Sequence, residues 1–351
     1  MRFTLLRTVT IIIVTVIGIS CGHESHDRSI QINKFPIESY LKYDSGQVLD
    51  IPSIGIMEIN TFNDKLILST SESSALWQIY SLPEVNSIGS IFRSGAGPGE
   101  LIEPTPSIIA SFYSRKEDNH VMCIIPQMMS GKFVAGDLTD NISKDTVINN
   151  KIGPMTMMAY RLDDLRWFNI EIVPDSCKIR RSIIGNAGKV MANQAIDSLN
   201  HASVRDMSQI PLLMFRPIIS ANGLWVAEIG GYKPEINIWN SRTGESNQII
   251  YQDIDDSYSA MRSRLTENKP LFQGGIALDN FFAVQRYNGE GGINIDFFRW
   301  NGRPAATLSL DYDNIRRFAI DIKNGDLYCL DADRDVIIKF PIRDFLSQLK
   351  K

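Results

Sequence analysis

The side chains that could hold a ligand lie in short polar loops, where tyrosine stands beside charged residues. Tyr232-Lys233 and Arg286-Tyr287 each place an aromatic ring next to a cation. In such a pair the ring supplies contact area and the charge orients a polar ligand. The expected ligand-binding residues are Arg93, Glu100, Tyr232, Lys233, Arg286, Tyr287 and Glu290. The alternative interpretation of each of these residues is a solvated loop tip.

The sequence lacks the common catalytic signatures, G-x-S-x-G and H-E-x-x-H. Of four histidines, only His120 and His201 lie away from the N-terminal region, and zinc or copper sites normally use several His or Cys ligands. The turn Asp331–Asp335 begins like a calcium loop, but Val336 replaces the required glycine and Ile342 replaces the bidentate glutamate. We therefore predict no catalytic residue, no metal site and no cofactor.

Composition restricts the class of partner. The chain has 36 basic and 40 acidic residues, and no run of basic residues occurs. Phosphate binding requires clustered Lys and Arg, so we expect no nucleic-acid partner. Beyond residue 21 the cysteines are Cys123, Cys177 and Cys329, each in or beside a strand-like run. Free buried thiols are the expected state, and one disulfide among the three stays open as an alternative.

Six similar units follow one another along the chain and must position these loops. In each unit, two short apolar runs flank an Asn, Asp or Gly turn, and a third run follows a polar loop. The turns lie at residues 63, 118, 163, 222, 279 and 324, with spacings of 55, 45, 59, 57 and 45. Such turns are strong hairpin signals, and repeats of this length predict an all-β, six-bladed β-propeller. A β-sandwich is the alternative, but it does not explain six similar units.

The ends of the repeat array predict how the ring closes. The last unit ends after its third strand, at Pro341, and Gln47–Ile51 is a spare strand before the first unit. Pairing this N-terminal strand with the last blade would leave no exposed sheet edge at the seam. The predicted boundaries are a signal peptide at 1–20, a tether at 21–46, the propeller at 47–342 and a short tail at 343–351. We expect one helix, at Arg343–Lys350.

The segment between the first two units carries a family resemblance. Gly95-Ala96-Gly97-Pro98-Gly99-Glu100-Leu101, with Pro104 after it, resembles the linker that leads into NHL-type propeller repeats. Ala319–Asp321 and Asn324–Tyr328 of the last unit are similar to the NHL repeat itself. The chain also resembles TolB-like six-bladed propeller lipoproteins of Bacteroides-type bacteria. A dinucleotide-binding interpretation of the glycines fails, because Glu100 replaces the third glycine and the prolines prevent a helix.

The N-terminus has the layout of an export signal. Arg2 and Arg7 precede an apolar run from Val9 to Ile19, and Cys21 follows directly. This arrangement resembles the lipobox of bacterial lipoproteins and implies lipidation at Cys21, although Gly18 stands where leucine is usual. A transmembrane anchor is an alternative, but a run of about 11 to 13 residues is too short to span a bilayer. A plain signal peptide is the other alternative.

Two functions remain open from the sequence. The first is a lipoprotein of the cell envelope that is anchored to the outer membrane through its lipid. Its propeller would bind a peptide, a glycan or a partner protein. The second is a propeller enzyme, a lyase or hydrolase acting on an extracellular polymer. The enzyme hypothesis would require an acid–base pair from Arg93, Glu100, Tyr287 and Glu290, and a shared fold alone is weak support for it.

We predict that Cys21→Ala either leaves the precursor uncleaved or moves the protein to the soluble fraction. Each acyl chain contributes about 0.8 kcal/mol per buried CH₂, so the loss of the acylated thiol removes the anchor. Metabolic labelling with a palmitate analogue measures the modification directly. Unchanged labelling of the variant would show that the lipobox interpretation is wrong.

Overall fold

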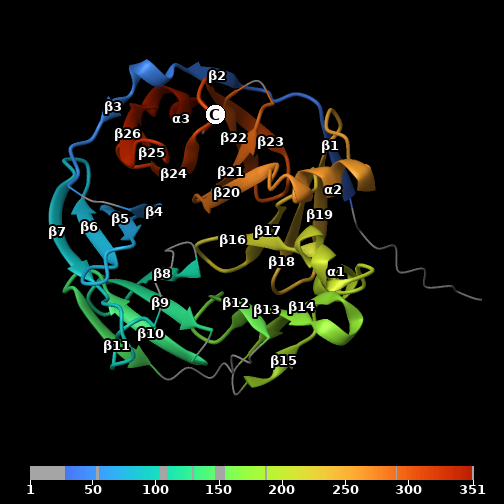
Figure 1. Ribbon diagram of the computed structural model, residues 1–351, viewed down its shortest axis with the longest axis horizontal. Helices are drawn as coiled ribbons and strands as arrows, with labels where there is room; N and C mark the ends of the chain where they lie inside the picture. Colours follow the sequence, from blue (N-terminus) through green and yellow to red (C-terminus); the bar gives the residue numbers. More distant parts are fainter. Residues whose placement is uncertain are drawn as a thin grey trace, which may run out of the picture.

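The computed structural model describes residues 28–52, 55–102, 109–128, 130–146, 155–185, 188–289 and 291–349. In these residues, six β-sheets stand around a central axis, and the first strand of each repeat lies nearest the axis (Figure 1). Sheets arranged in this way are the blades of a propeller. The chain is thus an all-β, six-bladed β-propeller, and the predicted fold class is confirmed.

The blades follow one another along the chain, and the sheets are antiparallel apart from two added outer strands described below. Blade 1 comprises β4 (Ile56–Phe62), β5 (Lys65–Thr70), β6 (Trp77–Ser81) and β7 (Asn86–Ile91). Blade 2 comprises β8 (Ser111–Ser114), β9 (Val121–Gln127), β10 (Lys132–Asp137) and β11 (Ile142–Thr146). Blade 3 comprises β12 (Thr156–Arg161), β13 (Trp167–Val173), β14 (Lys178–Ile184) and β15 (Val190–Met191).

Blade 4 contains β16 (Phe215–Ile219), β17 (Trp225–Gly230), β18 (Glu235–Asn240) and β19 (Ser246–Tyr251). Blade 5 contains β20 (Phe272–Ala277), β21 (Phe281–Tyr287), β22 (Ile293–Arg299) and β23 (Pro304–Leu310). Blade 6 is built from β24 (Ile315–Asp321), β25 (Asp326–Asp331), β26 (Val336–Pro341) and β3 (Gln47–Val48).

The first hairpin of several blades turns at the residues that the repeat pattern indicated. Asn63 and Asn119 have φ values of 55° and 60°, and Gly223 and Gly325 have 64° and 77°. Asparagine and glycine tolerate this left-handed conformation better than other residues. At Gly223 a Cβ atom would lie 1.7 Å from the carbonyl oxygen of Leu162, so the close approach of blades 3 and 4 requires glycine there.

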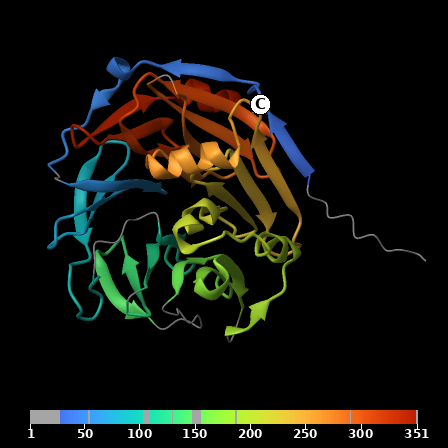
Figure 2. The same cartoon turned by 45° about the vertical axis from the view of Figure 1, so that its right-hand side comes forward.

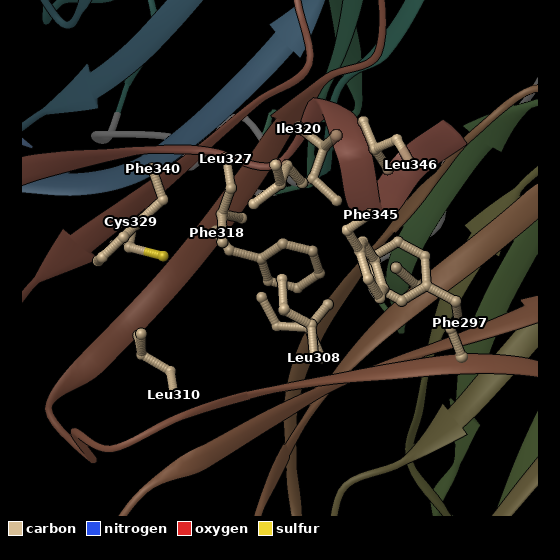
Figure 3. Close-up of a cluster of buried hydrophobic side chains, with 14 of the residues drawn as sticks. Phe297, Leu308, Leu310, Phe318, Ile320, Leu327, Cys329, Phe340, Phe345 and Leu346 are labelled. Carbon is tan, nitrogen blue, oxygen red and sulfur yellow. The ribbon is translucent and has the colours of Figure 1, made fainter. Parts of the chain in front are cut away.

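The hydrophobic core lies between neighbouring blades rather than at one centre. Figure 3 shows the cluster between blades 5 and 6, where Phe318 and Leu327 of blade 6 face Leu308 of blade 5. The C-terminal helix α3 (Arg343–Leu349) covers this cluster, and its Phe345 ring lies 5.2 Å from that of Phe297. The helix confirms the prediction for Arg343–Lys350 up to Leu349. Both faces of a blade are apolar because each packs against a neighbour.

The three cysteines of the described residues are free thiols. Cys123 and Cys329 are buried, as expected, whereas Cys177 is half-buried. Burial raises the pKa of the Cys123 and Cys329 thiols well above its usual value. Because the thiolate is the reactive form, these two residues serve as small apolar side chains of the core.

Ring closure occurs as the sequence predicted. Strand β3 pairs antiparallel with β26, with Val48 opposite Ile338 and Gln47 opposite Lys339. The pairing is short, but the backbone N–H of Leu49 continues it by donating to the carbonyl of Ile337 at 2.9 Å. An N-terminal strand therefore completes the last blade and covers its outer edge.

The prediction of a tether at residues 21–46 is wrong for the part that the structure describes. Strand β1 (Arg28–Ile32) pairs parallel with β19 and strand β2 (Glu38–Leu41) pairs parallel with β23, each as a fifth outer strand. Ile32 and Phe35 are buried, and the Phe35 ring contacts Phe298 at 5.6 Å. In the sequence these few apolar residues stand among polar neighbours and do not indicate a strand. The segment forms strands only because it pairs with the open outer edges of two blades.

Two linkers between blades contain helices that the sequence analysis did not predict. Between blades 3 and 4 lie α1 (Gln194–Leu199) and the 3₁₀ helix η5 (Met207–Leu213), and between blades 4 and 5 lies α2 (Tyr258–Thr266). Two further 3₁₀ turns are η1 (Tyr43–Ser45) and η3 (Pro174–Ser176). Figure 2 shows α2 and the linker helices over one side of the ring. The helix α2 contains no buried residue, so it has no apolar stripe from which a helix could be predicted.

We expect Phe345→Ala to lower the free energy of unfolding by about 3 to 5 kcal/mol, because it leaves a cavity where α3 covers blades 5 and 6. Urea unfolding followed by circular dichroism measures the change. Gln348→Ala is the control, since Gln348 is exposed on the same helix. Equal stability of the two variants would mean that α3 does not contribute to the core.

Candidate functional site

One face of the ring carries both the linkers between blades and the loops between the second and third strands of each blade. Backbone hydrogen bonds join these segments: Leu271 N–H donates to the Gly231 carbonyl at 2.7 Å, and Val204 N–H donates to the Cys177 carbonyl at 3.1 Å. We call this face the upper rim. The two longest described linkers, at 192–214 and 252–271, both lie beside blade 4 there.

An open pocket of about 390 Å³ lies on the upper rim between these two linkers. We call it the blade-4 groove. Four of its lining residues are apolar, and its polar side chains come from three separate segments. The lining residues are Ser203, Val204, Arg205, Gln209, Leu212, Leu213, Lys233, Tyr258 and Met261. Its volume falls in the range of ordinary ligand pockets, about 300 to 1,000 Å³.

The charges that line the blade-4 groove are positive. Arg205 is exposed and Lys233 is half-buried, and no lining residue is acidic. The Lys233 ammonium lies 3.4 Å from Glu235 Oε1, just outside the groove, and 6.0 Å from the centre of the Phe215 ring. An incoming anionic group would therefore meet Arg205 with no acidic side chain beside it in the lining.

A buried ion pair contacts Leu213, one of the residues that line the groove. Arg181 Nε donates to Glu228 Oε2 at 2.7 Å, and both side chains are almost fully buried. Trp239 Nε1 donates to the other carboxylate oxygen of Glu228 at 3.2 Å. The Arg181 guanidinium also lies over the Phe215 ring and reaches the carbonyl of Leu213 at 3.5 Å. Because every charge in this network has a partner, the position of Leu213 is fixed before a ligand arrives.

One arginine attaches α2 to the rim. Arg264 Nη1 donates to the Tyr232 carbonyl at 3.0 Å, and its Nη2 donates to the Asp255 carbonyl at 2.6 Å. The Ser257 hydroxyl caps the helix by accepting from Ala260 N–H at 3.3 Å. Since α2 has no buried residue, these polar contacts determine where Tyr258 and Met261 lie along the groove wall.

Of the expected binding residues, Lys233 lines the blade-4 groove, and Tyr232 lies next to it. Tyr232 is half-buried, and its hydroxyl approaches Asn268 Oδ1 at 3.5 Å. Both lie between β17 and β18, in the loop between the second and third strands of blade 4 on the upper rim. A role in ligand binding stays a prediction for both residues.

Arg286 and Tyr287 lie at the end of β21 and do not line the blade-4 groove. Arg286 Nε donates to the buried carboxylate of Asp296 at 2.7 Å, and its guanidinium lies over the Tyr251 ring. Burial, and then the charge of Asp296, raises the pKa of Tyr251 well above its usual value, so its hydroxyl stays protonated and donates to Asp296 at 2.8 Å. Tyr287 packs against the core between blades 5 and 6. Arg286 is therefore engaged in a network that joins blades 4 and 5.

Glu100 closes its own loop. Its carboxylate accepts from Gly97 N–H at 2.8 Å and occupies the space where a side chain at Gly95 would lie. Gly99 has φ of 75° and packs against the backbone of Ser143 in blade 2, where a Cβ would lie 2.6 Å from a carbonyl oxygen. The glycines thus permit a tight crossover between blades, and Arg93 is exposed beside it.

Two expected site residues, Glu290 and Cys21, lie outside the described residues. Sequence reasoning missed most of the groove, since Val204, Arg205, Leu212, Leu213 and Met261 belong to the linkers. The length of these two linkers could have indicated a binding surface, because connections between strands are usually much shorter.

A group of metal-ligand type occurs on the opposite face, at the first turn of blade 2. His120 Nδ1 lies 2.9 Å from Asp137 Oδ2 and 3.6 Å from Asp140 Oδ2. Arg115 Nη2 lies within the same group, 3.0 Å from His120 Nδ1 and 3.3 Å from Asp137 Oδ2. A guanidinium that already neutralises these carboxylates competes with a metal ion. We interpret the group as an ion network that holds two turns together.

No protein-family model matches the chain, and no curated protein matches it. Among solved structures, a candidate exported protein from Bacteroides fragilis is 13% identical with a TM-score of 0.49, covering 89% of this chain and 98% of that one. The Cps50 (Swd1) β-propeller domain from Myceliophteria thermophila is 10% identical with a TM-score of 0.41, covering 85% and 99%. The hydrazine synthase of Kuenenia stuttgartiensis is 11% identical with a TM-score of 0.44, covering 86% and 81%.

None of the helices within the described residues has the length and apolar character that crossing a membrane would require.

The His120 network predicts a pH-dependent contribution to stability. The hydrogen bond to Asp137 raises the pKa of His120 above its usual value. Its contribution is fully present below about pH 6.5, the unfolded value, and is lost as the pH rises through the folded value. We expect the stability difference between wild type and His120→Gln to be constant below about pH 6.5 and to shrink as the pH rises through the higher pKa of the folded state. Urea unfolding at each pH measures it, with the exposed His201→Gln as the control. A difference independent of pH would contradict the network.

Proposed function

We propose that this protein is a ligand-binding propeller of the cell envelope, and that its blade-4 groove binds a protein or peptide segment with an apolar side chain beside a carboxylate. The observation that carries the proposal is the lining of the groove. Four apolar side chains line it together with Arg205 and Lys233, and no lining residue is acidic. This combination suits a ligand with one apolar and one anionic group.

A peptide fits this lining better than a glycan does. The hydroxyl groups of a sugar need hydrogen-bond partners when they are buried. Among the lining residues only Ser203, Gln209 and the phenol of Tyr258 offer uncharged polar side chains, whereas Val204, Leu212, Leu213 and Met261 are apolar. Apolar contacts of this kind provide binding free energy, and the cations fix the orientation of the ligand.

The fixed lining of the groove supports tight binding of a small ligand. The Arg181–Glu228 pair and the Arg264 contacts position Leu213 and Met261 through hydrogen bonds that exist without the ligand. When a ligand enters such a groove, few protein side chains lose conformational freedom. The entropic cost of association is correspondingly lower.

The lipid anchor proposed at Cys21 would direct the blade-4 groove away from the membrane. Strand β1 runs parallel with β19, so Arg28 pairs with Asn247 at the lower end and Ile32 pairs with Tyr251 at the upper rim. The seven residue steps from Cys21 to Arg28 reach at most about 25 Å when fully extended. An acylated Cys21 would thus hold the lower face or edge of blade 4 toward the bilayer and leave the groove open to partners.

Selection from a random peptide library against the wild-type protein tests the proposal. We expect the recovered peptides to carry Asp or Glu next to Leu, Met or Phe. A synthetic peptide of that kind should bind Arg205→Glu at least about tenfold more weakly, because the reversed charge repels its carboxylate. Fluorescence polarisation of the labelled peptide measures the affinity.

Arg262→Glu is the matched control for this measurement. Arg262 is exposed on α2, one residue after Met261, and does not line the groove. It changes the net charge by the same amount, so the affinity should stay at the wild-type value. The proposal fails if no peptide is enriched, or if both variants bind the peptide equally.

A further inference from the structure

A second polar cluster lies at the upper end of the central channel, apart from the blade-4 groove. It is formed by Glu58 on β4, Arg216 on β16, Gln273 on β20 and Arg317 on β24. These are inner strands of four different blades, and each residue is second or third in its strand. Figure 1 shows these strands around the central axis. We call this group the channel-mouth cluster.

Both arginines of the channel-mouth cluster lie against β20. Arg216 Nη1 donates to the carbonyl of Gln273. The next residue, Gly274, has no side chain, and a Cβ there would lie 3.8 Å from Arg317 Cδ. Arg317 Nε donates to Glu58 Oε1 at 2.7 Å, and its Nη1 donates to the carbonyl of Arg316 at 2.7 Å. One short stretch of β20 thus has a guanidinium group on either side of it.

Gln285 holds this stretch in place. Its Nε2 donates to Gln273 Oε1 at 2.6 Å and to the Ile315 carbonyl at 2.5 Å, which ties β20 to the start of β24. The side chain is fully buried, and its Oε1 has no hydrogen-bond partner among the described residues. The acceptor for Arg216 and the strand that carries Arg317 are therefore fixed relative to each other.

The charges at the channel mouth do not balance. Arg216, Arg316 and Arg317 all act on the single carboxylate of Glu58. By contrast, the buried carboxylates of Glu228 and Asp296 are each paired with one arginine, Arg181 and Arg286. Burial, and then the charge of Arg317, lowers the pKa of Arg216, since both disfavour its charged form.

Arg216 is nevertheless open to solvent, and its hydrogen bond to the Gln273 carbonyl uses one of its nitrogen atoms. A guanidinium group has five N–H donors in a planar fork that matches a carboxylate, sulfate or phosphate group. We propose that the channel mouth binds an oxyanion group of a small ligand between Arg216 and Arg317. The bound anion supplies the counter-charge that the cluster lacks. Tyr232 lies close enough to Arg216 to affect the pKa of that arginine.

Thermal unfolding at constant ionic strength tests this site. The probes are sodium sulfate, sodium phosphate and sodium malonate in the low millimolar range, each compared with sodium chloride. We expect the wild-type melting temperature to rise with at least one oxyanion, since a ligand that binds only the folded state stabilises it. Malonate as the strongest probe would indicate a carboxylate ligand, and sulfate or phosphate a tetrahedral one.

Variants that weaken or strengthen anion binding at this site distinguish it from general effects of salt on stability. Arg216→Gln should bind the active anion about tenfold more weakly. Arg216→Lys, which keeps the charge and loses the fork, should retain part of the response. Glu58→Gln should bind more tightly, because it removes the competing carboxylate. Arg303→Gln, which removes an exposed arginine outside the cluster, is the control and should respond like wild type.

Two results would overturn the proposal: no anion-dependent shift in the wild type, or an equal shift in wild type and Arg216→Gln. The peptide-binding assay distinguishes this outcome from a failure of the proposed function. No residue is common to the channel-mouth cluster and the blade-4 groove lining, so Arg216→Gln should leave the affinity of groove-binding peptides unchanged.

Discussion

The structure depends on the closure of the ring between blades 6 and 1. The paired residues of β3 and β26 are few, but other contacts cross the same seam. The Asp335 carboxylate accepts from the backbone N–H groups of Gly55 and Ile56 at 2.6 and 3.0 Å. Thr61 donates to the carbonyl of Ile320 at 2.7 Å. Without closure the edge of β26 and the apolar faces of both blades would be exposed to water, and the inner strands would no longer surround a channel.

The closed ring is a rigid support for segments that are less constrained. Each blade is packed on both faces, so a change in one blade is felt by its neighbours. The linkers beside blade 4 differ, because α2 is held by the two hydrogen bonds of Arg264 and a serine cap rather than by burial. Binding surfaces in proteins commonly lie on such connections, while the scaffold determines their spacing. The blade-4 groove follows this rule.

Arginine has two roles in this propeller. At Glu228 and Asp296 one guanidinium group meets one buried carboxylate, and neighbouring Trp239 or Tyr251 completes the hydrogen bonding. Such pairs fix the packing of adjacent blades, since an unpaired buried charge would be costly. At the channel mouth, by contrast, three arginines act on Glu58. The surplus charge of Arg216 lies in a solvent-accessible position, and we assign it to binding.

The sequence by itself determined the repeat. Hairpin turns such as Asn222-Gly223 and Asn324-Gly325 are local, because the left-handed backbone that they need depends on the residue type alone. Six such turns were enough to predict the blades, and the spare strand at residue 47 was enough to predict how the ring closes. The helix α3 was also predictable as a short apolar segment after the last strand.

Only the tertiary structure decided which residues meet at the sites. Ile30 and Ile32 became a strand because β19 offers an open edge, and the prediction of a tether there failed for that reason. Arg286 and Glu100 looked like exposed loop residues, yet one pairs with Asp296 and the other closes its own loop. Arg216 and Arg317 are 101 positions apart, and Arg205 and Met261 are 56 apart. Their proximity results from the curvature of the ring, which no local pattern of residues encodes.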